Sequence, residues 1–111
     1  AAWDRVRGPG HPVRVSRTVV QRVLKDRVGL VVRDVAGSDA MRQVKTLTEL
    51  KVSSLLCVPL LVAQRVLGVI YLDSTNPLSE FDENHLQVMT AVAGIASLAF
   101  DNVKQWEKLL R

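Results

Sequence analysis

The sequence predicts an α+β domain in which one antiparallel sheet is flanked by helices. Two β-rich runs at 53–62 and 66–73 are separated by about three residues, which is typical of a hairpin. A long segment with apolar stripes follows at 83–109, and a shorter helical pattern at 17–27 precedes the runs. With 111 residues, the chain is long enough for one domain with a single modest core.

The composition is that of a soluble globular protein. Hydrophobic residues make up 48% of the chain and charged residues 23%, which excludes an intrinsically disordered class. The most apolar run, 55–63, is far shorter than the roughly 20 apolar residues of a membrane span. The first residues do not form the basic-then-apolar pattern of a secretion signal. We therefore expect a cytoplasmic location and no membrane contact.

Positive charge is concentrated at the N-terminal end of the chain. Residues 1–27 hold seven Arg or Lys against two Asp, whereas residues 28–111 hold eight against nine Asp or Glu. Such a basic segment is compatible with nucleic acid or an acidic partner. Because it has no aromatic interleaving beyond Trp3 and no helix-turn-helix spacing, a solvated face is the favoured interpretation and nucleic-acid binding is not expected.

The first predicted helix covers residues 17–27. We interpret residues 1–15 as a strand remnant and a loop, because Gly8-Pro9-Gly10 interrupts any regular element. Ser16 is a good N-cap, since its hydroxyl can accept from free backbone N–H groups of the first turn. The apolar residues that follow lie on one helical stripe: Val19, Val20, Val23 and Leu24.

A short strand and an irregular segment follow this helix. Gly29 ends the helical pattern, and residues 30–32 favour a strand. Gly37-Ser38-Asp39 is turn material. From 41 to 50, the apolar spacing predicts a short irregular helix or two turns.

The run at 53–62 is apolar at successive positions, which predicts a central strand covered on both faces. The residues Ala63-Gln64-Arg65 join it to the run at 66–73, so the two strands form an antiparallel hairpin. Cys57, the single cysteine, excludes an internal disulfide and a CxxC metal site. We interpret it as a small buried apolar residue, with a redox or chromophore-attachment role as the alternative.

The strongest prediction is a helix at 82–110, with Asp82 as its N-cap. One apolar stripe would cover the sheet: Leu86, Met89, Ala93, Ala96, Phe100 and Val103. The residues predicted for the opposite, polar face include Gly94, Ser97, Asp101 and Lys104. A second apolar stripe needs another cover, either another helix of the same domain or the same helix of a second subunit.

We expect this second stripe to form a homodimer interface. Val88, Ile95, Asn102 and Leu109 repeat every seven residues, and Asn102 would set the register of a helix pair. The predicted interface residues are Val88, Val92, Ile95, Ala99, Asn102, Trp106 and Leu109.

No catalytic constellation is found in the sequence. The two histidines, His11 in a predicted loop and His85 in the first turn of the last helix, are interpreted as solvated. Gly8-Pro9-Gly10 does not match a phosphate-binding pattern. We therefore predict that the chain is not an enzyme and holds no metal.

Four local strings together resemble the GAF domain family over about residues 15–105. They are Ser16-Arg17-Thr18-Val19-Val20, Ser53-Ser54-Leu55-Leu56-Cys57-Val58-Pro59-Leu60, Leu67-Gly68-Val69-Ile70-Tyr71-Leu72-Asp73, and Phe81-Asp82-Glu83. The wording is most similar to GAF domains linked to forkhead-associated domains, in front of AAA+ transcription activators or nucleotide cyclases. The resemblance implies an α/β sandwich of the GAF/PAS kind in a single, partial domain at 1–111.

Two departures from the family pattern have consequences. A full GAF domain carries an N-terminal helix and two strands before the part that begins here, so the sheet would have an unpaired edge. We expect dimerisation or strand exchange to compensate. Neither the cyclic-nucleotide nor the bilin signature of the family is complete, and the methionine-sulfoxide-reducing relatives need at least two cysteines. The cofactor is therefore unknown.

The resemblance places a ligand pocket between the sheet and the segment 37–51. The candidate ligand-binding residues there are Asp39, Arg42, Lys45, Thr46 and Thr48, although a solvated loop face explains these residues equally well. The implied function is a regulatory sensor of a multidomain signalling or transcription-regulatory protein, which binds a small ligand or partner and relays it through the last helix to a covalently linked output domain. The alternative is a structural dimerisation module without a ligand.

Overall fold

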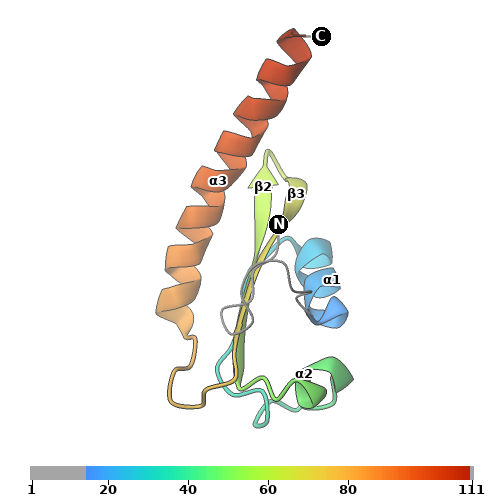
Figure 1. The fold of residues 1–111 in the computed structure, drawn as a ribbon, viewed down its shortest axis with the longest axis vertical. Coiled ribbons are helices and arrows are strands. Elements are labelled where there is room, and N and C mark those ends of the chain that lie inside the picture. Colours follow the sequence, from blue (N-terminus) through green and yellow to red (C-terminus); the bar gives the residue numbers. More distant parts are fainter. Residues whose placement is uncertain (1–14, 111) are drawn as a thin grey trace.

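The computed structural model describes residues 15–110, which form three layers (Figure 1). A three-stranded antiparallel sheet in the order β1-β2-β3 lies in the middle, with α3 on one face and α1 and α2 on the other. The elements are α1 (Arg17–Asp26), β1 (Leu30–Val32), α2 (Lys45–Glu49), β2 (Ser54–Val62), β3 (Arg65–Ser74) and α3 (Glu83–Leu109). This confirms the predicted α+β class. The strand remnant and loop expected at 1–15 lie outside the described residues, except for Val15.

Helix α1 begins at the cap that the sequence predicts. The Ser16 hydroxyl accepts a hydrogen bond from the Val19 N–H at 3.3 Å, and Val19 and Val23 are buried against the sheet. The helix ends one residue earlier than expected, because Arg27 adopts the left-handed conformation with φ 56°. Its N–H still donates to the Val23 carbonyl, which closes the last turn.

Strand β2 is the central strand, with apolar side chains packed on both of its faces as predicted. Leu55 and Cys57 belong to the core under α1 and α2, whereas Leu56 and Val58 belong to the core under α3. This confirms the interpretation of Cys57 as a buried residue, and burial raises the pKa of its thiol to about 11. Strand β3 has a neighbour on one side only among the described residues, as the resemblance implied.

The hairpin connection is tighter than predicted. Ala63 and Gln64 alone form the turn, and Arg65 already belongs to β3, where it pairs with Val62. Both turn residues have positive φ, 50° and 65°, which is the pattern of a type I′ turn. The sequence lacks the Asn-Gly signal of such turns, which is why the loop was predicted one residue too long.

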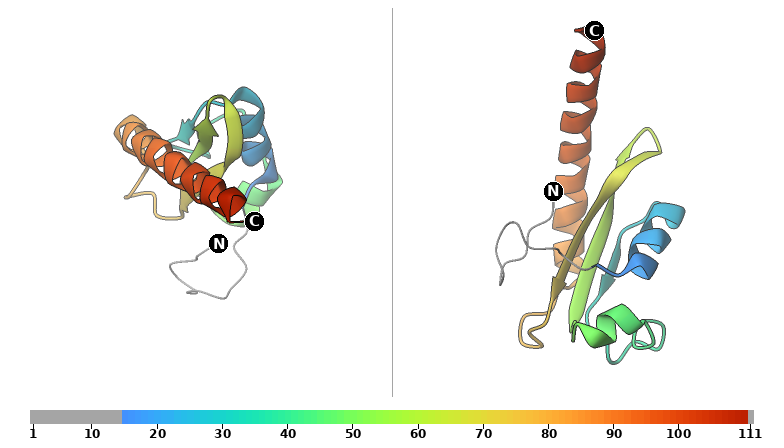
Figure 2. Two further views of the ribbon diagram at one scale, coloured as in Figure 1. Left: turned by 90° about the horizontal axis from the view of Figure 1, so that it is seen from above. Right: turned by 45° about the vertical axis from the view of Figure 1, so that its right-hand side comes forward.

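Helix α2 and its flanking turns close the sheet at the end away from the hairpin tip, as Figure 2 shows. Met41 and Leu47 are buried in the same core as Leu55, and this confirms the irregular helix predicted over 41–50. The segment therefore owes its position to two apolar anchors, and Arg42, Gln43 and Lys45 between them are exposed.

Helix α3 runs unbroken over the predicted residues and begins with a capping box. The Asp82 carboxylate accepts from the N–H groups of Asn84 and His85 at 2.9 and 3.1 Å. In return, Nδ1 of His85 accepts from the Asp82 N–H at 3.0 Å. His85 was expected only to be solvated, and its capping role is the finding that the sequence did not predict.

Removal of this cap by Asp82→Ala is expected to lower the midpoint of unfolding at neutral pH. The hydrogen bond from the His85 N–H is the main cause that lowers the pKa of Asp82 in the folded state. A lowered pKa adds stability above the unfolded-state pKa, and that stability is lost as pH falls through the folded-state pKa. Denaturant melts of both chains across this range should therefore converge in acid. A constant difference would contradict the account.

The face of α3 that packs on the sheet differs in part from the predicted stripe. Leu86, Met89, Ala93 and Ala96 pack there as predicted. Ser97, placed on the polar face by the sequence, is fully buried, because its hydroxyl is satisfied by the Ala93 carbonyl at 2.6 Å and its small size allows close approach. The predicted sheet residues Phe100 and Val103 are instead exposed, and Phe100 borders an open cavity between α3 and the hairpin.

Candidate functional site

A cavity of about 430 Å³ lies along β1. Strand β1 is one of the two edge strands of the sheet, and β3 is the other. Its walls come from four parts of the chain: Arg22 of α1, strand β1 itself, the loop 33–41, and Glu83 at the start of α3. The cavity is open to solvent and has both polar and apolar walls. Because Arg22 belongs to α1 and Glu83 to α3, a ligand bound there would contact the helix layers on both faces of the sheet.

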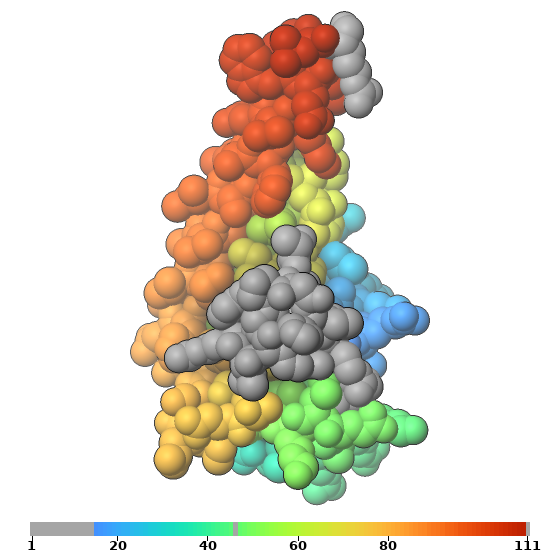
Figure 3. Space-filling view, viewed as in Figure 1, coloured from blue at the N-terminus to red at the C-terminus, as the bar shows by residue number. Residues whose placement is uncertain are grey.

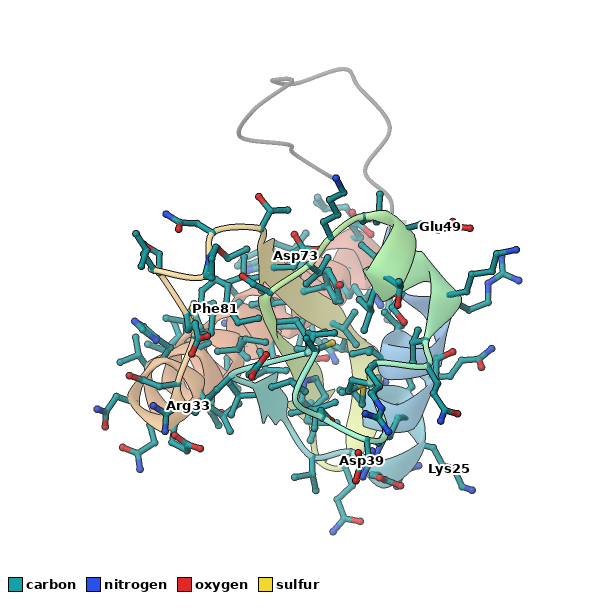
Figure 4. All side chains as sticks on the ribbon, turned by 90° about the horizontal axis from the view of Figure 1, so that it is seen from below. Lys25, Arg33, Asp39, Glu49, Asp73 and Phe81 are labelled. Carbon is teal, nitrogen blue, oxygen red and sulfur yellow. The ribbon has the colours of Figure 1, made fainter. Side chains whose placement is uncertain are left out.

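The charges around this cavity are balanced and held in weak ion pairs. Arg33 Nη1 lies 3.9 Å from Glu83 Oε2, and Arg22 Nε lies 3.9 Å from Asp26 Oδ2. All four side chains are more than half exposed, so the pairs contribute little to stability and can exchange partners. Figure 4 shows Arg33 beside the start of α3 and Asp39 on the side of α1. The Arg33–Glu83 pair links the β1 edge to α3.

Of the predicted ligand residues, Asp39, Arg42, Lys45 and Thr48 do not line this cavity. Asp39 and Arg42 form an exposed ion pair at 3.4 Å, and Lys45 pairs with Glu49 at 3.8 Å. The Thr48 hydroxyl lies within hydrogen-bond distance of the Arg42 and Val44 carbonyls, at 3.0 and 3.3 Å. The Thr46 backbone belongs to α2, and its side chain lies outside the described part of the chain. The ion pairs and the threonine bonds stabilise the segment itself.

The beginning of the same segment does line the cavity, through Gly37, Ser38, Ala40 and Met41. A Cβ atom on Gly37 would lie 2.6 Å from Asp34 Oδ2, so a larger residue at 37 would require the exposed Asp34 side chain to move. Ser38 caps the following turn by accepting from the Met41 N–H at 3.3 Å. The signal that could have found this wall is the Gly37-Ser38 turn directly after a strand.

The second candidate surface is the outward face of α3, which we define by the seven predicted interface residues. Each of them is exposed, for example Ile95 by 72%, Trp106 by 65% and Val92 by 42%. Among the described residues, the other two helices lie across the sheet, so no helix of the same chain covers this face. The first of the two covers that the sequence allowed is therefore not observed.

The charged residues of α3 avoid the outward face. Asp101 follows the buried Ser97 by four residues and Lys104 follows it by seven, so both lie on the sheet side of the helix. Lys108 follows Asp101 by seven and Glu107 follows Phe100 by seven, which places them on that side or at its border. Gln87, Thr90, Gly94 and Gln105 of the predicted polar face are exposed, whereas Ser97 and Asp101 lie against the sheet. The outward face itself carries no charge.

The last turns of α3 extend beyond the sheet and the hairpin, as Figures 1 and 3 show. Residues 102–110 are all exposed. Among residues 15–110, α3 is also the one helix whose length and composition would suit a membrane span. Only 11% of its most apolar stretch is buried inside the fold. A single helix of this kind is weak evidence for a membrane.

The titratable residues with shifted pKa values do not supply a nucleophile or a general base. Burial, followed by the charge of Asp73, raises the pKa of Tyr71 and keeps its phenol neutral. Burial also keeps Cys57 protonated at neutral pH. Within residues 15–110, no three His, Cys, Asp or Glu side chains gather at a distance that would hold a metal ion.

Comparison with known proteins identifies the fold. The family model described as GAF domain matches residues 4–101. The crystal structure of a GAF domain/HD domain protein from Geobacter sulfurreducens is 21% identical, with a TM-score of 0.59 over 76% of this chain and 55% of that chain. The GAF domain of A. aeolicus nlh2 in an inactive state is 22% identical, with a TM-score of 0.56 over 75% and 52%. This chain thus spans about half the length of these structures. Among curated proteins, no sequence matches it.

Proposed function

The chain belongs to the GAF domain family, whose members are generally sensory or regulatory and typically not catalytic, and we propose that it is a non-enzymatic sensor module that works as a dimer. In this proposal, a small ligand or a partner is received at the cavity along β1. Helix α3 passes the change to an output domain linked to it, and the outward faces of two α3 helices meet in the dimer.

The outward face of α3 is the observation that supports the dimer. A surface helix of a monomeric domain normally directs polar residues toward water, whereas the outward face of α3 is exposed and carries no charge. Seven adjacent exposed positions without a charge are typical of an interaction surface. A second copy is the partner we propose. If two parallel α3 helices pair through this face, the Asn102 residues of the two copies lie opposite each other, at the place where Asn102 interrupts the apolar repeat.

The walls of the cavity support the proposed relay. Glu83 belongs to the first turn of α3, and Arg33 belongs to the loop that follows β1. A ligand that contacts Arg33 competes with Glu83 for this guanidinium and so alters the contact between the β1 edge and α3. Because a ligand shifts an equilibrium only by its differential affinity, this exchange of partners is the physical basis of the signal.

The wider setting is proposed from the sequence resemblance. We place the module in a cytoplasmic signalling or transcription-regulatory protein, linked to a forkhead-associated, AAA+ or nucleotide cyclase region. Neither a membrane nor a nucleic acid is among the partners we propose.

One observation favours the second candidate function, a structural dimerisation module without a ligand. The cavity is open, and Asp39, Arg42, Lys45 and Thr48 have partners within their own segment: Asp39 pairs with Arg42, Lys45 with Glu49, and the Thr48 hydroxyl bonds the Arg42 carbonyl. In that case the α3 dimer alone is the function.

Native mass spectrometry of the purified chain separates the two candidates. For the sensor we expect dimers that carry a small molecule, and loss of that molecule when Gly37→Val fills the cavity wall. Ala40→Gly, which leaves the wall open, is the matched control. Dimers of bare chain mass from cell extracts would favour the structural module, and monomers would contradict both candidates.

A further inference from the structure

The hairpin tip and α3 are tied together at the point where the helix leaves the sheet. Nη2 of Arg65, the first residue of β3, donates to Oδ1 of Asp101 at 2.9 Å. The side chain of Asp101 is only 21% exposed, so solvent screens this pair less than the other ion pairs described above. Beyond Asp101, residues 102–110 are all exposed.

The hairpin tip contains two irregular features, a turn with positive φ angles and a bulge. Ala63 and Gln64 both hold positive φ, a conformation that costs roughly 1–2 kcal/mol for each non-glycine residue. A register shift between Leu60 and Leu61 inserts a bulge just before the tip, and bulges bend and twist a strand. The tip is thus strained, and the bulge separates it from the regular ladder.

Space between the tip and the helix allows them to move relative to each other. A cavity of about 140 Å³ is lined by Leu60 and Leu67 of the hairpin and by Phe100 and Lys104 of α3. Phe100 is 55% exposed and Lys104 is exposed, so the packing does not enclose the helix at this point. Lys104 lies three residues after Asp101, within reach of its carboxylate along the same helix.

We propose that Arg65 and Asp101 form a latch that sets the direction in which the free end of α3 leaves the domain. In the latched state Asp101 binds Arg65 and the helix lies against the hairpin. In the released state Asp101 pairs with Lys104, the strained turn relaxes, and the free end of α3 turns away from the hairpin.

The functional consequence of the latch depends on the proposed function, because the direction of α3 decides how the outward faces of two copies meet. Its existence does not depend on that function. A movement of the sheet of a few tenths of an ångström at the hairpin is converted into a larger displacement at the end of the helix, which extends two further turns beyond Asp101.

Spin labels can measure the direction of α3 in the whole chain. One label is placed on α1 by Gln21→Cys and one on the free end by Lys108→Cys, both of which are exposed sites. Cys57 is fully buried and does not interfere. Dilution with unlabelled chain removes distances between copies. We expect a single narrow distance in the parent chain, and a broader distribution with a longer mean in Arg65→Glu.

Charge exchange provides the control. The double variant Arg65→Asp with Asp101→Arg restores the ion pair, and we expect it to restore the narrow distribution. If Arg65→Glu does not fold, Arg65→Gln carries the same test, because 60% of the replaced side chain is exposed. An unchanged distribution in the single variant, or no recovery in the exchanged pair, overturns the latch. The molecular mass of the labelled chain in solution shows separately whether the chain forms a dimer, so a failure of the latch and a failure of the proposed function can be told apart.

Discussion

A chain carrying Ile95→Asp is expected to be monomeric at concentrations at which the parent chain is a dimer. Ile95 lies at the middle of the outward face and is 72% exposed in the single chain, so an aspartate there costs the monomer little. In the dimer the same carboxylate would be buried without a partner, which weakens association by about 3 kcal/mol or more, roughly 100-fold in Kd. Light scattering across a concentration series measures the change. Trp106→Asp, nearer the end of the same face, should act in the same direction.

The matched control is Gln87→Asp, which adds the same charge to an exposed position of α3 that does not belong to the outward face. It should leave the mass unchanged. Equal masses for the parent chain and the Ile95→Asp chain would contradict the dimer, and equal weakening by both variants would show that net charge, and not the face, controls association.

The second large effect is expected in the core. Leu56 is fully buried between β2 and α3 in the cluster that seats the helix on the sheet. Leu56→Ala removes buried apolar surface and leaves a cavity, which is expected to lower the free energy of unfolding by about 3 kcal/mol. Chemical denaturation followed by circular dichroism measures it. Leu78→Ala, at a residue that is 93% exposed, is the control and should change the free energy by less than about 0.5 kcal/mol. A loss below about 1 kcal/mol for Leu56→Ala would contradict the packing.

The elements of this fold could be predicted because their signals are local. Ser16 and Asp82 mark helix starts through hydrogen bonds to N–H groups two or three residues away. The run of apolar residues in β2 follows from burial on both faces, and Leu55 and Leu56 indeed belong to different cores. The turn at Ala63 and Gln64 was harder, because neither residue favours the left-handed conformation that the hairpin imposes on it.

The candidate site was harder to predict, because it depends on contacts between distant segments. Polar residues of the segment 37–51 were natural ligand candidates, yet Asp39 and Arg42 pair with each other and the Thr48 hydroxyl donates to the Arg42 carbonyl. The cavity is instead lined by Glu83 and Arg33, which are 50 residues apart and meet only in the fold.

Ser97 and Asp101 show the same limit on the helix. Hydropathy places both on a polar face, but Ser97 is buried with its hydroxyl bonded to its own turn, and Asp101 is partly buried beside its partner Arg65 in β3. The sheet side of the helix therefore includes two residues of the predicted polar face, and the outward face lies in solvent. The sequence therefore predicted the seven interface candidates as a group, and the fold shows how fully they are exposed.

The most direct test of the central proposal is a disulfide cross-link between two copies through Asn102→Cys. If the outward faces pair in parallel, the two new cysteines face each other and mild oxidation should convert most of the chain into a covalent dimer, since Cys57 is buried. Gln105→Cys, exposed on the neighbouring flank, should cross-link far less. Equal, low yields at both positions would contradict the pairing of the outward faces of α3.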